Sequence, residues 1–386
     1  MVALLLLVGI GVAIFVGFNI GGSSTGVAFG PAVGSKALSK TSAAALMSLF
    51  FLLGGATVGT EVIDTMGGKI VPSEQFSLAA SVIVLFFVGL ALLVSNLFGV
   101  PASTSMTAVG AIAGLGVATE TIFWSEMGRI VSAWLIAPIV AFWVCAMIGR
   151  YLYPHLAAHF TLESPGPGTS RREQFGGILV VAIACYMAFS AGASNAANAV
   201  APLVGSGELQ LYPGIAIAGG AVALGAFTIA RRTLDMVGND LTQLPILAAL
   251  IVETISATII TALSVMGIPA SLAVSATMCV VGLGWGRATR TTKLADAAGA
   301  AVSGESEKPT AVSTGAITEE VTPGPDVESG AGNPEVAPIG EEEPDQVTAA
   351  DLFDPAATGR VVMLWILTPT ISAVGSYLVF QFLPVP

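Results

Sequence analysis

The pentapeptide Gly-Val-Pro-Ala-Ser at residues 99–103 recurs, with one conservative change, as Gly-Ile-Pro-Ala-Ser at residues 267–271. Each copy stands between two apolar runs, and the two copies are offset by 168 residues. A proline at the first turn of a helix already has the backbone that this position requires. Each pentapeptide therefore predicts the start of a helix, and its recurrence indicates an internal repeat.

Two further blocks recur in the same order along the chain. Residues 61–67 parallel residues 232–238 with an offset of 171, and residues 129–138 parallel residues 360–369 with an offset of 231. Coincidence explains three ordered blocks poorly, so the sequence predicts two copies of one unit. The larger last offset indicates about sixty residues inserted before the final segment of the second copy.

Ten apolar runs, five in each copy, dominate the chain outside this insertion. Of all residues, 54% are hydrophobic and 10% are charged, whereas about 25% are charged in a soluble domain. Several runs reach the length of about 20 residues that a membrane-spanning helix needs. We therefore expect an all-α polytopic membrane protein of two repeats, with broken or re-entrant helices at its centre. The runs are 2–18, 41–59, 76–98, 101–118, 130–151, 175–189, 213–230, 245–266, 269–286 and 361–380.

The net charge of −11 comes from one segment. Residues 294–359 hold fourteen of the 25 acidic residues and one of the 14 basic ones, so this segment carries −13 and the rest of the chain +2. Its prolines, glycines and carboxylates cannot build a core, which predicts disorder. Such acidity suits a halophilic organism, and an ordinary disordered acidic loop is the alternative.

These observations divide the chain into five parts. The parts are a first transmembrane repeat (1–152), a connecting loop (153–174), four segments of the second repeat (175–290), the acidic linker (291–357) and a last helix (358–386). If every run crosses once, twelve Lys and Arg residues share one side, and only Lys69 and Arg129 fall on the other. Positively charged loops are usually cytoplasmic. We therefore expect a plasma-membrane protein with both termini extracellular, a cytoplasmic linker and two repeats of opposite orientation.

Two polar stretches interrupt the apolar pattern at matching places. Residues 17–26 include Ser23 and Ser24, and residues 190–199 include Ser194, Asn195 and Asn198. Backbone can leave helical geometry inside a membrane only where it is buried or lines a wet cavity. Broken helices there would direct free N–H groups, at the positive ends of helix dipoles, towards an anion. Close helix contacts between small residues are the alternative.

The recurrent pentapeptides add hydroxyl groups. Ser103, Thr104 and Ser105 are consecutive, and Ser271 ends the second pentapeptide. Hydroxyls next to exposed N–H donors can bind a tetrahedral oxyanion without a buried charge, although capping alone also explains them. Glu253 is the only carboxylate deep inside an apolar run. It is expected either to serve a cation or proton, or to bond a neighbouring helix.

These motifs resemble those of the inorganic phosphate transporter (PiT) family, whose halves each carry Gly-Ala-Asn-Asp-x-x-Asn and later Pro-Val-Ser-Thr-Thr-His. The resemblance implies phosphate held near the membrane centre between the halves and coupled to sodium or protons. This chain departs from the pattern, because Ser23-Ser24 and Ser194-Asn195 replace the family's Asn-Asp pairs. Asn198 matches, and both carboxylates are absent.

We therefore predict a secondary symporter of inorganic phosphate. Sulfate or another oxyanion is the second substrate, and a passive channel or transport-inactive relative is the rival interpretation. An enzyme is poorly supported, and neither the cysteines nor the two histidines suggest a metal site or cofactor. The expected partners are the oxyanion and the bilayer, with no nucleic acid; a homo-oligomer is left open. The predicted substrate residues are Ser23, Ser24, Ser103, Thr104, Ser105, Ser194 and Ser271, and the predicted cation ligands are Asn195, Asn198 and Glu253.

Overall fold

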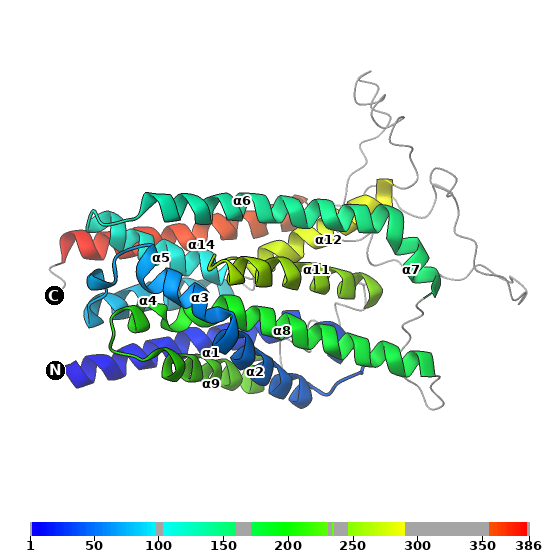
Figure 1. Ribbon diagram of the computed structural model, residues 1–386, viewed down its shortest axis with the longest axis horizontal. Coiled ribbons are helices and arrows are strands. Elements are labelled where there is room, and N and C mark those ends of the chain that lie inside the picture. The colour runs from blue at the N-terminus through cyan, green and yellow to red at the C-terminus, as the bar shows by residue number, and fades with distance from the viewer. Residues whose placement is uncertain are drawn as a thin grey trace, which may run out of the picture.

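The computed structural model describes residues 2–97, 103–159, 171–230, 234, 246–289 and 355–383. Within these residues every regular element is a helix, and the long helices lie roughly side by side along one axis (Figure 1). The main helices are α1 (Val2–Gly34), α2 (Lys40–Thr57), α3 (Gly59–Asp64), α4 (Leu78–Leu97), α5 (Thr104–Ala118), α6 (Trp124–Met147), α7 (Tyr153–His159), α8 (Arg171–Gly205), α9 (Leu211–Thr228), α11 (Ile246–Val265), α12 (Leu272–Ala288) and α14 (Pro355–Phe382).

The ten predicted apolar runs each fall in a helix, which confirms the all-α polytopic class. Seven described helices are long and apolar enough to cross a membrane, and α4, α5 and α12 are shorter apolar helices. The acidic linker lies outside the described residues, apart from its last three, which belong to α14. The predicted connecting loop is partly helical, because α7 and the start of α8 occupy its two ends.

Four of the ten runs form two hairpins instead of crossing once each. The ends of α4 and α5 lie together, since Phe123 N donates to Ile70 O at 2.9 Å just before the one helix and just after the other. Near the opposite end of the bundle, Ala248 of α11 and Leu283 of α12 share one apolar cluster. The expectation of ten single crossings is therefore wrong. Hydropathy cannot separate one full span from two shorter helices that return to the same side.

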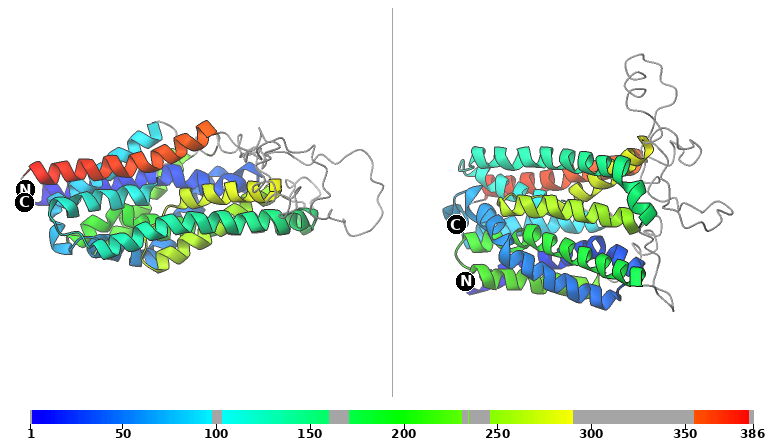
Figure 2. Two further views of the ribbon diagram at one scale, coloured as in Figure 1. Left: turned by 90° about the horizontal axis from the view of Figure 1, so that it is seen from above. Right: turned by 45° about the vertical axis from the view of Figure 1, so that its right-hand side comes forward.

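The hairpins do not alter the predicted relation between the termini. Outside the hairpins each half contributes three candidate spans, α1, α2 and α6 in the first and α8, α9 and α14 in the second. Three is also an odd number. The start of α1 and the end of α14 lie at the same end of the bundle in all three views (Figures 1 and 2). The inverted orientation of the repeats and the membrane side of each end stay predictions.

The close contacts between helices follow the repeat. At Gly54 of α2 an added Cβ would lie 1.9 Å from the Phe189 carbonyl oxygen of α8, and at Gly225 of α9 it would lie 2.1 Å from that of Phe18 in α1. Both members of the second contact are separated by 171 residues from their counterparts in the first. Helix α2 of the first copy therefore packs on α8 of the second just as α9 of the second packs on α1 of the first.

The hairpins show the same exchange of partners. An added Cβ would lie 2.4 Å from the Ala373 carbonyl oxygen at Gly114 of α5, and 2.1 Å from the Phe142 carbonyl oxygen at Gly282 of α12. These positions are related by the offsets of 168 and 231 seen in the sequence. Each hairpin is thus anchored to the last helix of the other half.

A Gly54→Ala substitution is expected to destabilise the protein by about 1–3 kcal/mol, because the methyl group would force the backbones of α2 and α8 apart. Gly11→Ala is the matched control, since an added Cβ there meets no atom within 4 Å. Thermal unfolding of both purified variants in detergent checks this. Equal midpoints for the two variants would contradict the packing described here.

Both predicted helix breaks near the first span of each repeat are wrong. Helix α1 continues through Ser23 and Ser24, and α8 continues through Ser194 and Asn198. The small residues serve close packing, since an added Cβ at Gly192 would lie 2.0 Å from the Phe51 carbonyl oxygen. This is the small-residue contact that the sequence left as the alternative.

Candidate functional site

The start of α5 meets the middle of α8. The Thr104 hydroxyl donates to Asn195 Oδ1 at 2.7 Å, and the hydroxyls of Ser105 and Ser194 lie 3.4 Å apart. Ser105 and Ser194 are fully buried, and Asn195 is nearly so. The structure therefore brings two neighbouring hydroxyls of the first pentapeptide region onto two neighbouring polar residues of the second repeat.

Asn198 joins these residues from the next turn of α8. Its Nδ2 donates to Thr104 Oγ1 at 3.2 Å, to Ser105 Oγ at 3.2 Å and to Asn195 Oδ1 at 3.0 Å. The side-chain oxygen of Asn198 is buried and has no hydrogen-bond partner within the described part of the chain. Asn198 thus combines satisfied donors with one free acceptor.

The tip of the second hairpin reaches the same point from the other repeat. The Ser194 hydroxyl donates to the Ala270 carbonyl oxygen at 2.6 Å. Because its proton is used there, Ser105 supplies the proton of the Ser105–Ser194 contact. The hydrogen bonds therefore run in one direction, from the Asn198 amide through Ser105 and Ser194 to the Ala270 carbonyl. Such chains strengthen one another in a buried setting.

Two helices begin at this meeting point. Ser103 is the N-cap of α5 and accepts from Met106 N at 3.3 Å, and Ser271 is the N-cap of α12 and accepts from Val274 N at 3.3 Å. A helix N-terminus carries a partial positive charge and exposed N–H groups, both of which favour an anion. Around these two ends stand only neutral hydroxyl and amide side chains of Thr104, Ser105, Ser194, Asn195 and Asn198. Such a set suits an oxyanion that accepts hydrogen bonds.

Two predicted substrate residues lie outside this hydrogen-bond network. The Ser23 hydroxyl donates within its own helix, to Asn19 O at 3.1 Å and Ile20 O at 3.2 Å. Ser23 and Ser24 are both half-buried. Among the described residues, neither bonds to the residues that meet at the hairpin tips. The structure brings together the hairpin residues and α8, but not the matching stretch of α1.

Glu253 occupies a separate position in α11. Its side chain is 4% exposed, and both carboxylate oxygens are buried without a hydrogen-bond partner in the part of the chain that the structure describes. Leu250 and Ala257, one turn away on either side, are buried in the main apolar core. An unpaired carboxylate costs much free energy in such surroundings, which marks Glu253 as a group that needs a proton or a cation. The described residues contain no cluster of three or more potential metal ligands.

Two residues that contact the second hairpin tip were not among the predicted site residues. Arg129 Nη1 donates to Met266 O at 2.9 Å, and Trp134 Nε1 donates to Pro269 O at 2.8 Å. The available signal is their recurrence as Arg360 and Trp365 in the second copy. Recurrence alone indicates packing as readily as function, so only the structure reveals these contacts.

Comparison with known proteins agrees with the sequence motifs. Residues 20–376 match the model of the phosphate transporter family. The sulfate permease CysP of Bacillus subtilis is 33% identical over 273 residues, which cover 70% of this chain and 75% of that protein. The chloroplastic inorganic phosphate transporter 2-1 of Arabidopsis thaliana is 23% identical over 380 residues, covering 71% and 64% of the two chains.

The fold also matches a solved structure. A sodium-dependent phosphate transporter superimposes with a TM-score of 0.68 at 16% sequence identity, over 97% of this chain and 98% of that one. At this identity the likeness concerns the fold. It extends over nearly the whole chain, including both hairpins and the helices that hold them.

Proposed function

Because the chain belongs to the phosphate transporter family, we propose that it is a secondary active transporter of inorganic phosphate. The observation that carries the proposal is the meeting of two capped helix N-termini, from two hairpins, at the buried hydroxyls and amides of α8. Relatives described as phosphate transporters support this choice of substrate. An arriving anion would replace hydrogen bonds that Thr104, Ser105 and Ser194 otherwise make to one another.

Transport requires that this point open to each side in turn. The two hairpins belong to different repeats and contact α8 through separate residues, Thr104 and Ser105 for the first and Ala270 for the second. Withdrawal of either tip would expose the bound anion while the other tip stays in place. Inverted-repeat transporters commonly alternate in this manner around a fixed central site.

The coupling ion is sodium or a proton, and the chain offers two places for it. The free Oδ1 of Asn198 is a neutral oxygen ligand next to the anion site, which suits sodium. The unpaired carboxylate of Glu253 suits a proton or a cation. The absence of the family's paired carboxylates leaves Glu253 as the acidic residue of the described core.

The first test is uptake of labelled phosphate into proteoliposomes that contain the purified full-length protein. An inward sodium gradient and an inward proton gradient are imposed separately. We expect accumulation above the external concentration under one of them. Uptake that only equilibrates under both gradients would instead support a passive channel, and no uptake would support a transport-inactive relative.

Sulfate is a second candidate that a specific observation favours. Sulfate accepts hydrogen bonds only, whereas phosphate near neutral pH keeps a proton that needs an acceptor. The side chains at the hairpin tips are mainly donors, and Asn198 Oδ1 is the one side-chain acceptor found free there among the described residues. The 33% identical relative is named as a sulfate permease. Both observations suit an anion without a proton.

Competition separates the two substrates. Labelled phosphate uptake is measured with excess unlabelled sulfate, and labelled sulfate uptake with excess unlabelled phosphate. For a phosphate transporter we expect sulfate to compete weakly. Strong inhibition of phosphate uptake by sulfate, together with weak inhibition in the reverse experiment, would make sulfate the substrate.

The membrane orientation is proposed from charge. Lys36 and Lys40 lie between α1 and α2, and Arg171 and Arg287 lie near the start of α8 and the end of α12. These positions belong to the end of the bundle opposite the termini. An excess of Lys and Arg marks the cytoplasmic side. The proposal is therefore a plasma-membrane protein with extracellular termini and a cytoplasmic linker.

A further inference from the structure

The tip of the α11–α12 hairpin, residues 266–271, is a tight turn with few internal bonds. Gly267 has a left-handed backbone, with φ of +70°, which favours glycine. Gly267 N donates to Ser264 O and Ile268 N to Leu263 O, both at 2.9 Å. These two bonds end α11 and reverse the chain. The carbonyl groups that follow point away from the tip, and other helices hold them.

Three of these carbonyl oxygens accept hydrogen bonds from side chains of two different helices. From α6, Arg129 donates to Met266 O and Trp134 donates to Pro269 O, at 2.9 and 2.8 Å. From α8, Ser194 donates to Ala270 O at 2.6 Å. The tip is therefore suspended between α6, which lies outside the anion site, and α8, which carries it. Movement of the tip away from α8 must first break the bonds to α6.

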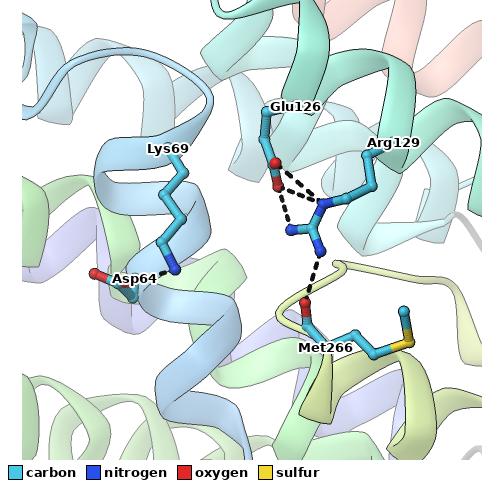
Figure 3. A network of polar contacts seen from close by, with 5 residues as sticks. All are labelled: Asp64, Lys69, Glu126, Arg129 and Met266. Carbon is cyan, nitrogen blue, oxygen red and sulfur yellow. Dashed lines mark hydrogen bonds and ion pairs between the residues drawn. The ribbon is translucent and has the colours of Figure 1, made fainter.

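Glu126 orients the arginine for this task. The Arg129 Nε donates to both Glu126 carboxylate oxygens, at 3.0 and 3.2 Å, and Arg129 Nη2 forms an ion pair with the same group. This leaves Nη1 to donate to Met266 O, as Figure 3 shows. The accepting carbonyl lies just beyond the C-terminus of α11, where a positive charge is favoured. The neighbouring Lys69–Asp64 pair in the figure is separate and bonds within its own segment.

The cluster stands where solvent can reach it. The Arg129 side chain is 39% exposed and Glu126 18%, whereas Ile268 in the tip is 2% exposed. The exposed pair thus covers a buried turn, at the end of the bundle where both termini lie. This arrangement has the form of a fastening: an accessible group outside, and a sealed segment behind it.

We propose that Glu126, Arg129 and Trp134 form a latch that holds the α11–α12 tip closed on the anion site from the side of the termini. They are positioning residues, because they act through the Ala270 carbonyl and the Ser271 cap and do not touch the anion. Release of the latch frees the tip to leave Ser194, which opens the site towards that side. The inference rests on the proposed transport function for its purpose, although the latch itself can be tested without transport.

The test measures how easily the tip opens in the full-length protein in proteoliposomes. Ile268→Cys is introduced after Cys145, Cys185 and Cys279 are replaced by alanine, and a membrane-impermeant thiol reagent is added from the side of the termini. Trp134→Phe keeps the ring and removes the N–H donor, and Arg129→Gln removes the charge. Each is expected to raise the labelling rate about tenfold, as for the loss of one buried hydrogen bond. Trp143→Phe, a 52% exposed tryptophan of the same helix, is the matched control and should change nothing.

A second measurement protects the test if the cysteine variant fails to fold. Hydrogen–deuterium exchange of the Gly267 and Ile268 amides needs no cysteine, and it should be about tenfold faster in Trp134→Phe than in Trp143→Phe. Equal labelling and equal exchange in these two variants would overturn the latch. Faster opening in a protein that moves neither phosphate nor sulfate would leave the latch standing and remove the proposed function.

Discussion

An Asn198→Ala variant is expected to take up labelled phosphate with a kcat/KM roughly a hundredfold below that of the unchanged protein. The amide of Asn198 makes three hydrogen bonds, to Thr104, Ser105 and Asn195. Its loss removes the start of the bond chain that ends at the Ala270 carbonyl. Each hydrogen bond in a buried site contributes about 0.5–1.5 kcal/mol, so two or three together account for the expected factor.

A matched pair on α5 serves as the control for this variant. Thr104→Val removes the 2.7 Å bond to Asn195 and should lower kcat/KM about tenfold. Thr107→Val removes a hydroxyl that bonds only the Ser103 carbonyl of its own helix, at 2.8 Å. It should stay within about threefold. Wild-type uptake by a folded Asn198→Ala protein would exclude this part of α8 from the substrate path.

The fold was largely predictable because the repeat and the apolar runs are long-range features of the sequence itself. The pentapeptides predict where α5 and α12 begin, and Ser103 and Ser271 are their N-caps. The hairpins were not predictable by the same means. A run such as 101–118 has the same composition whether its helix crosses the membrane or returns with its neighbour. The deciding contacts, such as Phe123 with Ile70, are made between residues far apart in the chain.

The candidate site shows the same limit. The stretches around Ser24 and Asn195 match in position and composition, yet only the second reaches the hairpin tips. Which copy meets the tips depends on how α1 and α8 pack against the other helices, and residue types alone do not determine this. Ser and Asn inside a membrane helix also satisfy local needs, as Ser23 does with the carbonyls of its own helix. The break predicted from their polarity was therefore unnecessary.

Glu253→Gln is expected to abolish accumulation of phosphate under the gradient that drives the unchanged protein, while exchange between equal concentrations stays within about threefold. Both carboxylate oxygens are buried without a partner among the described residues. Glutamine has nearly the same shape but can neither release a proton nor neutralise a cation. It should therefore stop coupling without disturbing the anion site, which lies on other helices.

Three measurements on proteoliposomes make this result decisive. Gradient-driven uptake, exchange and thermal stability are compared for Glu253→Gln and for Glu74→Gln, whose carboxylate is exposed on a short turn. The control should accumulate phosphate normally. Because removal of a buried, unpaired carboxylate relieves its desolvation cost, we expect Glu253→Gln to be at least as stable as the unchanged protein. Normal accumulation by Glu253→Gln would transfer the coupling role to the neutral oxygens of Asn195 and Asn198, and would favour sodium over protons.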